Sequence, residues 1–255
     1  MKFMKRKNPT AGTPITLLDM NKAWKISLPA GIVFLLISLY LWWQQGIDET
    51  VLFHFNPARI AGAPIVIVSK WLSSYGMAFI TVVFILYLLV SLRKASLDAP
   101  LTIYLYTIMS FSLSGIAGDL LKEVFARPRP VALFADLVYV ISNAASYASP
   151  SGHATKSVSL VLPFIFLVSC SRNIHKMVKV IVGLTAVGVC ISRVVLGAHY
   201  VSDVLAGLGV ALVGLPLTML FSNMILKRMK AEMLPTVSKV WGLLLIALTI
   251  LFLII

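Results

Sequence analysis

The 255-residue sequence contains little charge, since Asp, Glu, Lys and Arg together make up only 12% of it. A soluble globular domain carries about 25% charged residues. Hydrophobic residues account for 59% of the chain, and the mean hydropathy is +0.95. These values exclude an ordinary soluble domain and predict a membrane protein, with little of the chain left for a separate soluble unit.

Acidic residues are especially scarce, with 9 against 22 basic residues and a net charge of +13. An excess of basic residues is typical of proteins that bind nucleic acid, and also of the cytoplasmic loops of membrane proteins. The positions of these residues along the chain decide between the two interpretations. With a cytoplasmic N-terminus, 15 of the 22 basic residues fall in cytoplasmic segments. The distribution therefore predicts a protein of the cytoplasmic membrane with its N-terminus inside, and a nucleic-acid partner is not needed to explain the charge.

Cysteine is also rare, and both cysteines, Cys170 and Cys190, lie inside apolar runs. We interpret them as apolar filling and not as a disulfide or a metal site. The basic N-terminus precedes the apolar run Leu28–Trp43, which has no small-residue cleavage site and is therefore predicted to be an uncleaved anchor.

Apolar runs are what the sequence has in abundance. A helix needs roughly 20 residues to cross the hydrocarbon core. Besides the six runs given at the end of this paragraph, the sequence has the run Val240–Ile255, which has only 16 residues. We expect an all-α integral membrane protein with a bundle of six transmembrane helices and possibly a short seventh at the C-terminus. The six runs are Ile26–Trp43, Trp71–Leu92, Leu101–Leu121, Ala154–Cys170, Met177–Val195 and Val201–Leu226.

These runs divide the chain into three parts. Residues 1–25 form a basic cytoplasmic segment, of which Thr16–Lys25 is predicted to be a helix at the inner membrane interface. Residues 26–226 form the six-helix domain. Residues 227–255 form a basic loop and the possible additional helix.

Three short stretches at the ends of these runs carry polar chemistry. In the first, Lys122 and Arg129 are seven residues apart and would share one face of a continuing helix, which Pro128 and Pro130 then end. This places cations near the outer membrane surface, where charge is costly and often functional. The alternative is that these side chains simply extend toward lipid headgroups.

The second stretch is Pro150-Ser151-Gly152-His153, directly before an apolar run. Ser or Gly at a helix start leaves backbone N–H groups that form an anion site together with the helix dipole. His153 there can donate a proton to a leaving oxygen. The alternative is a helix cap with an incidental histidine.

The third stretch runs from Ser192-Arg193 to His199 and Asp203. His199 and Asp203 are four residues apart and can hydrogen-bond on a continuous helix. A carboxylate on one imidazole nitrogen leaves the lone pair of the other nitrogen free to attack. Arg193 adds a fork suited to phosphate oxygens. A purely structural His–Asp pair is the alternative.

In the expected topology all three stretches lie on the extracytoplasmic side, and together they describe a site for a doubly negative phosphate. Their pattern, K-x6-R-P, P-S-G-H and S-R-x5-H-x3-D, resembles the three-part signature of the type-2 phosphatidic acid phosphatase superfamily, in particular its bacterial membrane branch. The matching residues are Lys122, Arg129, Pro130, Pro150, Ser151, Gly152, His153, Ser192, Arg193, His199 and Asp203.

The resemblance implies a role for each residue. His199 would be the nucleophile that forms a phosphohistidine. Asp203 would orient it, and His153 would protonate the leaving group and then activate water. No metal or other cofactor is implied. The implied phosphate-binding groups are Lys122, Arg129, Arg193, the Ser151 hydroxyl and the Gly152 amide.

We therefore expect a membrane lipid phosphatase or pyrophosphatase, with an active site on the extracytoplasmic face and a phosphorylated lipid as its partner. The candidate substrates are polyprenyl pyrophosphate, phosphatidic acid, phosphatidylglycerol phosphate and lipid A phosphate. The alternatives are a phosphatase of soluble esters, a vanadate-binding haloperoxidase, and a non-enzymatic lipid carrier or flippase. The sequence predicts no oligomeric state.

Four further residues are interpreted from their positions alone. Arg127 lies off the family spacing and is assigned either to a lipid headgroup or to the interface. Asp119 could pair with a motif cation or face the interior of the bundle, and we expect a structural role for it. His54, in the loop after the first helix, and His175 are predicted to be surface groups.

Overall fold

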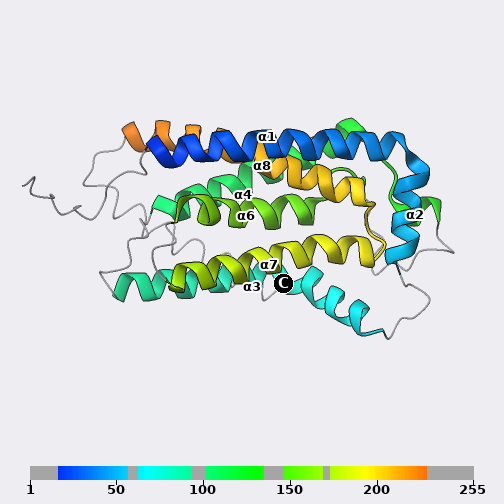
Figure 1. Ribbon diagram of the computed structural model, residues 1–255, viewed down its shortest axis with the longest axis horizontal. Helices are drawn as coiled ribbons and strands as arrows, with labels where there is room; N and C mark the ends of the chain where they lie inside the picture. Colours follow the sequence, from blue (N-terminus) through cyan, green and yellow to red (C-terminus); the bar gives the residue numbers. More distant parts are fainter. Residues whose placement is uncertain (1–16, 57–62, 94–101, 135–145, 169–172, 229–255) are drawn as a thin grey trace, which may run out of the picture.

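The computed structural model describes residues 17–56, 63–93, 102–134, 146–168 and 173–228, and within these ranges every regular element is a helix (Figure 1). This confirms the all-α class. The helices are α1 (Leu17–Trp43), α2 (Gln45–Phe55), α3 (Pro64–Arg93), α4 (Thr102–Phe125), α5 (Pro130–Leu133), α6 (Gly152–Leu167), α7 (Asn173–Val195) and α8 (Val201–Arg228).

The described part of each of the six predicted apolar runs falls largely in one helix, namely α1, α3, α4, α6, α7 or α8, while residues 101, 169 and 170 lie outside the described residues. Among the described residues, four stretches are long and apolar enough to cross a membrane: Ala23–Trp43, Pro64–Tyr87, Asn173–Val195 and Val201–Met224. Helix α6 is apolar but has only 16 residues. The count of six spans therefore remains a prediction, and Val240–Ile255 lies outside the described residues.

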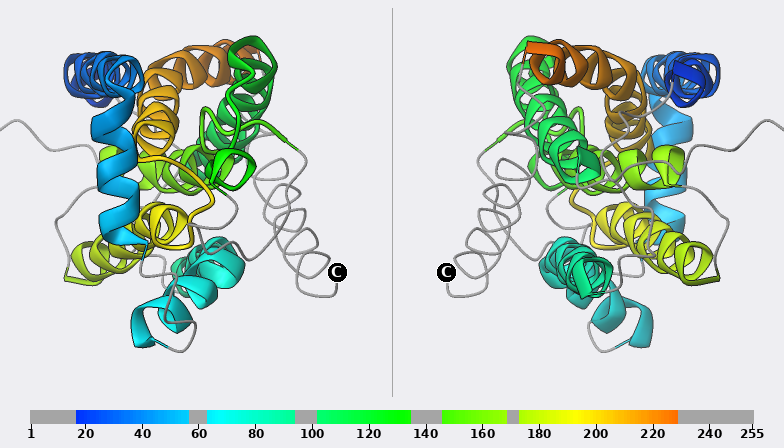
Figure 2. Two further views of the ribbon diagram at one scale, coloured as in Figure 1. Left: turned by 90° about the vertical axis from the view of Figure 1, so that its right-hand side faces the viewer. Right: turned by 90° about the vertical axis from the view of Figure 1, so that its left-hand side faces the viewer.

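Helix α6 occupies the centre of the bundle. It packs against α4, α7 and α8, while α1 packs against α8 and α3 against α7. Seen end-on in Figure 2, α1, α8 and α4 lie on one side of α6, and α7 and α3 lie on the other. Since α6 begins at Gly152, the P-S-G-H stretch lies at the end of the innermost helix.

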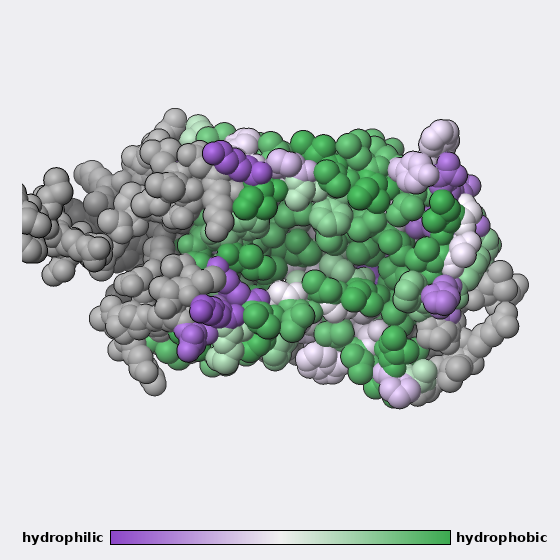
Figure 3. Space-filling view, viewed as in Figure 1, coloured by the Kyte–Doolittle hydropathy of each residue, from purple (hydrophilic) through white to green (hydrophobic). Residues whose placement is uncertain are grey.

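The distribution of side chains suits a lipid environment. Leu36 and Leu184 are exposed by 60% and 68%, whereas Ser110 and Ser114 are buried. Figure 3 shows a face that is hydrophobic along the middle of the helices and hydrophilic toward both ends. Small polar residues between helices allow close approach of backbones, as is typical of membrane bundles.

Helix α2 was not expected from the sequence, which predicted a loop after the first helix. It runs crosswise at one end of the bundle (Figure 1) and buries Asp48 and Leu52. Of the stretch Thr16–Lys25, residues 17–25 are described and form the first part of α1, so they are helical as predicted, while their place at the membrane interface stays a prediction.

His175 is not a surface group as predicted. It is only 1% exposed and its ring faces Tyr87 at 6.0 Å between centroids. The reason is that α7 begins at Asn173, so that His175 already lies on the packed part of that helix. His54, on α2, is exposed as predicted.

Candidate active site

The link between α7 and α8 fixes the position of His199. Gly197 adopts a left-handed backbone conformation with φ of 64°, which glycine accepts without strain. The amides of Ala198 and His199 then both donate to the carbonyl oxygen of Arg193, at 3.0 and 3.2 Å. His199 is therefore held over the end of α7 by main-chain bonds, and the residue is only 1% exposed.

The tautomer of His199 follows from its hydrogen bond. Its Nδ1 lies 2.8 Å from the carbonyl oxygen of Ala148. A carbonyl oxygen only accepts, so Nδ1 carries the hydrogen and Nε2 keeps its lone pair. Burial lowers the pKa of His199 to about 4, and Arg193 and Arg129 act in the same direction, whereas Asp203 opposes them. The imidazole is therefore neutral at pH 7, as a nucleophile requires.

Asp203 lies beside His199 but does not accept its hydrogen bond. The distance from His199 Nδ1 to Asp203 Oδ2 is 3.7 Å. That oxygen accepts instead from the amide of Tyr200 at 2.9 Å, and Oδ1 accepts from Arg127 at 2.7 Å. The sequence left Arg127 undecided between a headgroup contact and the interface; it is buried against the candidate catalytic carboxylate.

Two buried donors are suited to an anion. Ser151 is fully buried, and its amide donates to the carbonyl oxygen of Asp203 at 2.9 Å. Arg193 is 8% exposed and donates through one terminal nitrogen to Ser73. Within the described part of the chain, Ser151 Oγ and Arg193 Nε have no hydrogen-bond partner. A buried donor without a partner is costly, and such groups are often found where a ligand binds.

Lys122 and Gly152 lie side by side, which brings the first two stretches together. A Cβ added at Gly152 would lie 3.1 Å from Lys122 Nζ. The same ammonium lies 3.3 Å from Asp119 Oδ1, and Lys156 lies 3.2 Å from the other Asp119 oxygen. Asp119 thus pairs with a motif cation, and any residue larger than glycine at position 152 would press on Lys122.

Arg129 contacts the chain itself. Its Nε donates to the carbonyl oxygen of Ser146 at 2.7 Å, and a terminal nitrogen donates to Ser146 Oγ at 2.9 Å. The other terminal nitrogen lies 3.4 Å from the carbonyl oxygen of Ala198. Arg129 therefore joins the segment before α6 to the turn that carries His199.

His153 is the second residue of α6 and lies within a field of positive charge. Its pKa is lowered to about 3, first by burial and then by Arg193, His199, Lys122 and Lys156. Lys122 belongs to the first sequence stretch and Arg193 to the third, so cations from both stretches lie near His153, which belongs to the second. A bound phosphate dianion would offset them and allow the ring to hold a proton.

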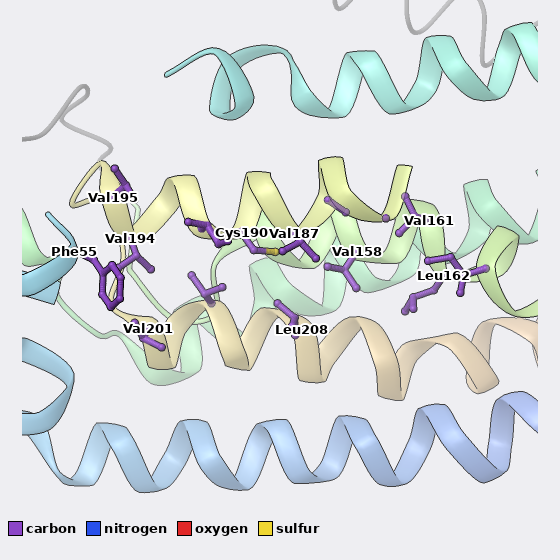
Figure 4. Close-up of a pocket in the computed structure, with 15 residues that line it drawn as sticks. Phe55, Val158, Val161, Leu162, Val187, Cys190, Val194, Val195, Val201 and Leu208 are labelled. Carbon is purple, nitrogen blue, oxygen red and sulfur yellow. The ribbon is translucent and has the colours of Figure 1, made fainter. Parts of the chain in front are cut away.

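An apolar cavity of about 620 Å³ lies between α6, α7 and α8 (Figure 4). It extends along α7 from Gly183 to Val195 and reaches Val201 on α8, so it ends at the turn that carries His199. On α6 it is lined by Val158, Leu162 and neighbouring residues. At 100° per residue these positions lie on the side of α6 away from His153.

The fold and the site together define a class: a helical membrane protein with a buried, cationic site around an unprotonated histidine at one end of its bundle. The chain belongs to the PAP2 superfamily, whose family model matches residues 100–227.

Two relatives extend this assignment. Phosphatidylglycerophosphatase B of Bacillus subtilis (strain 168) is 40% identical over 114 residues, which is 42% of this chain. The alignment covers 52% of that protein, about half its length. The crystal structure of the first transmembrane PAP2 type phosphatidylglycerolphosphate phosphatase from Bacillus subtilis superimposes with a TM-score of 0.58 at 25% identity, over 80% of this chain and 98% of that one.

Proposed function

We propose that this protein is a lipid phosphatase or pyrophosphatase that works through a phosphohistidine on His199. The observation that carries the proposal is the tautomer of His199, which leaves one ring nitrogen with a free lone pair. Its Nδ1–H is held by the Ala148 carbonyl at 2.8 Å, so the lone pair on Nε2 is free. Ser151 Oγ and Arg193 Nε, two of the buried donors without a partner in the described residues, suit the oxygens of the phosphoryl group.

The reaction has two steps. His199 Nε2 attacks phosphorus, the P–N bond forms, and the bond from phosphorus to the leaving oxygen breaks as His153 supplies a proton to that oxygen. His153 then takes a proton from water, the oxygen of this water attacks phosphorus, and the P–N bond breaks to release phosphate. Lys122, Arg193, Ser151 and the Gly152 amide would offset the developing negative charge.

Three observations support a lipid as the substrate. The relative that is 40% identical is named phosphatidylglycerophosphatase B. The cavity beside the His199 turn has a wholly apolar lining, which suits a hydrocarbon chain and offers no polar contact to a soluble ester. The site also lies on a bundle whose surface is apolar. Phosphatidylglycerol phosphate is therefore the first of the four candidate substrates.

The placement in the membrane is part of the proposal. Sorting of the basic residues supports a cytoplasmic N-terminus and an active site on the extracytoplasmic face of the cytoplasmic membrane. A non-enzymatic lipid carrier is the second candidate function, because the cations alone would grip a headgroup. A carrier, however, has no need of a histidine whose tautomer is fixed and whose second nitrogen is free.

The test is phosphate release by the full-length protein in detergent with EDTA present. The substrates are the four candidate lipids and one soluble ester. We expect release from at least one lipid, a much lower rate with the ester, and losses of several orders of magnitude in His199→Ala and His153→Ala. His54→Ala, an exposed histidine on α2, is the matched control and should keep full activity. Absence of release from every lipid, with lipid binding retained in His199→Ala, would favour the carrier.

A further inference from the structure

Arg127 lies between two buried carboxylates that are far apart in the sequence. One terminal nitrogen donates to Asp203 Oδ1 at 2.7 Å, and the other donates to Asp48 Oδ2 at 2.8 Å. The side chains of both aspartates are fully buried, and that of Arg127 is only 6% exposed. Asp48 comes from α2, outside every sequence stretch that carries a motif.

The surroundings of Arg127 hold it in one orientation. Its guanidinium lies over the ring of Tyr200 at 4.1 Å and near that of Trp42 at 5.2 Å, both within range of a cation–π contact. It also donates to Ser202 Oγ at 2.5 Å. The Ser202 amide donates to Asp48 at 3.1 Å, so the cluster closes on itself.

Stability alone is a poor explanation for this cluster. Removing three charged groups from water is costly, and apolar residues of similar volume often give an equal or more stable protein. Such a cluster is better explained when it orients a group that works in the reaction, because partners behind reactive side chains fix their position.

Arg127 reaches His199 by two routes. Its side chain holds Asp203, which lies 3.7 Å from His199 Nδ1. The main-chain carbonyl of Arg127 accepts from the amide of Ala148 at 2.8 Å. The carbonyl of Ala148 in turn accepts from His199 Nδ1. Asp203 and Ala148, the two neighbours of the His199 ring, are therefore both held by Arg127.

The charges of the cluster add a second argument. Arg127 by itself would cancel the charge of Asp203. With Asp48 included, one positive and two negative charges leave a net charge of −1 beside His199. When phosphorus bonds to Nε2 while Nδ1 keeps its hydrogen, the ring becomes positive, and the cluster offsets that charge.

We propose that Asp48 and Arg127 are positioning residues for the phosphohistidine reaction: Arg127 fixes Asp203 and Ala148 around His199, and Asp48 restores the negative charge that Arg127 removes. This inference rests on the proposed function, since it assumes that His199 is the nucleophile. Beyond the cluster, the charged and titratable groups around the ring are Arg193, Arg129 and His153.

The experiment measures kcat and KM of the full-length protein from about pH 3 to about pH 7, with phosphatidylglycerol phosphate in detergent micelles. Asp48→Asn should lower kcat about ten-fold or more, leave KM within about two-fold, and move the acid limb of kcat to lower pH, because a positive ring is less well offset. Arg127→Gln should also lower kcat but move the acid limb to higher pH, since Asp203 then acts on the ring uncompensated.

Two further variants make the outcome clear. Glu49→Gln removes the same charge from the next position of α2 and leaves both carboxylates that hold Arg127, so it should behave as wild type. Arg127→Lys keeps the charge but has one ammonium in place of a fork, so it should restore the acid limb and only part of kcat.

Acid limbs that stay in place or move in the same direction in Asp48→Asn and Arg127→Gln would overturn the inference. So would a loss of kcat no greater than that of Glu49→Gln. The proposed function fails separately, if the wild-type protein itself releases no phosphate from any lipid.

Discussion

Replacement of Asp203 by Asn tests what the carboxylate contributes once the ring is already held. Asn has the same shape but one acceptor oxygen in place of two, so it can accept from Arg127 or from the Tyr200 amide, and not from both in the present geometry. The Ala148 carbonyl continues to accept from His199 Nδ1, so the tautomer and the orientation of the ring should survive. The substitution therefore removes the negative charge and one accepted hydrogen bond, and it leaves the contact that holds the ring.

The expected loss follows from Coulomb's law. The ring becomes positive in the phosphohistidine, and Asp203 Oδ2 lies 3.7 Å from Nδ1. At an effective dielectric constant of about 20, a pair of unit charges at this distance interacts by about 4 to 5 kcal/mol. Each 1.36 kcal/mol is a factor of ten in rate, so we expect kcat to fall by about three orders of magnitude while KM stays within a few-fold.

The assay is phosphate release under saturating lipid, combined with a single-turnover reaction that is stopped with alkali to preserve phosphohistidine. The amount of phosphoenzyme formed at early times should fall in parallel with kcat. Glu123→Gln, which removes an exposed carboxylate from α4, should match wild type. A kcat for Asp203→Asn within ten-fold of wild type, in protein that remains folded, would refute the electrostatic role.

Three other predictions address the titration of the nucleophile, the cavity and the packing of α6. Because burial lowers the pKa of His199 to about 4, its unprotonated form should be lost only as the pH falls through about 4, and the reaction of phosphoenzyme formation should show its acid midpoint there and not near 6.5. Val187 lines the apolar cavity, and Val187→Trp should slow the lipid substrate several-fold more than a soluble ester. Leu184→Trp, on the same helix at a position that does not line the cavity, should affect neither substrate. Equal effects of Val187→Trp on both substrates would contradict a role of the cavity in holding the lipid chain. Gly207→Ala would place a methyl group 2.8 Å from the Ser151 carbonyl oxygen, and we expect a loss of about 1–3 kcal/mol in unfolding experiments in detergent.

The helices that form the bundle were predictable because each contains a long apolar run, a signal that depends on local sequence alone. Helix α2 was not, since Gln45–Phe55 mixes acidic, apolar and aromatic residues and is too short to span. The burial of His175 also depends on where α7 begins and on what packs against it, which hydropathy does not reveal.

The groups of the candidate site were predictable to the extent that side-chain spacing encodes them. The structure brings Lys122, Gly152, His153, Arg193 and His199 to one end of the bundle, as the three stretches indicated. The Ala148 contact of His199 and the place of Asp48 behind Asp203 could not be predicted from the sequence.

Ala148 acts through its backbone, which no residue type signals. Asp48 meets Ser202 across 154 positions of sequence, and nothing in its own neighbourhood marks it. Only the folded chain shows that these two residues belong to the site.

Helix α2 contributes to both the charged cluster behind His199 and the apolar cavity. Asp48 reaches into the charged cluster behind His199, and Phe55, two turns further along, lines the apolar cavity. A helix of 11 residues is nearly rigid, so a hydrocarbon chain that pushes on Phe55 also pushes on Asp48. On the proposed mechanism, the identity of the tail would then influence the rate of bond breaking at the phosphate. Lipids with the same headgroup and different chains should be distinguished by turnover and not only by affinity.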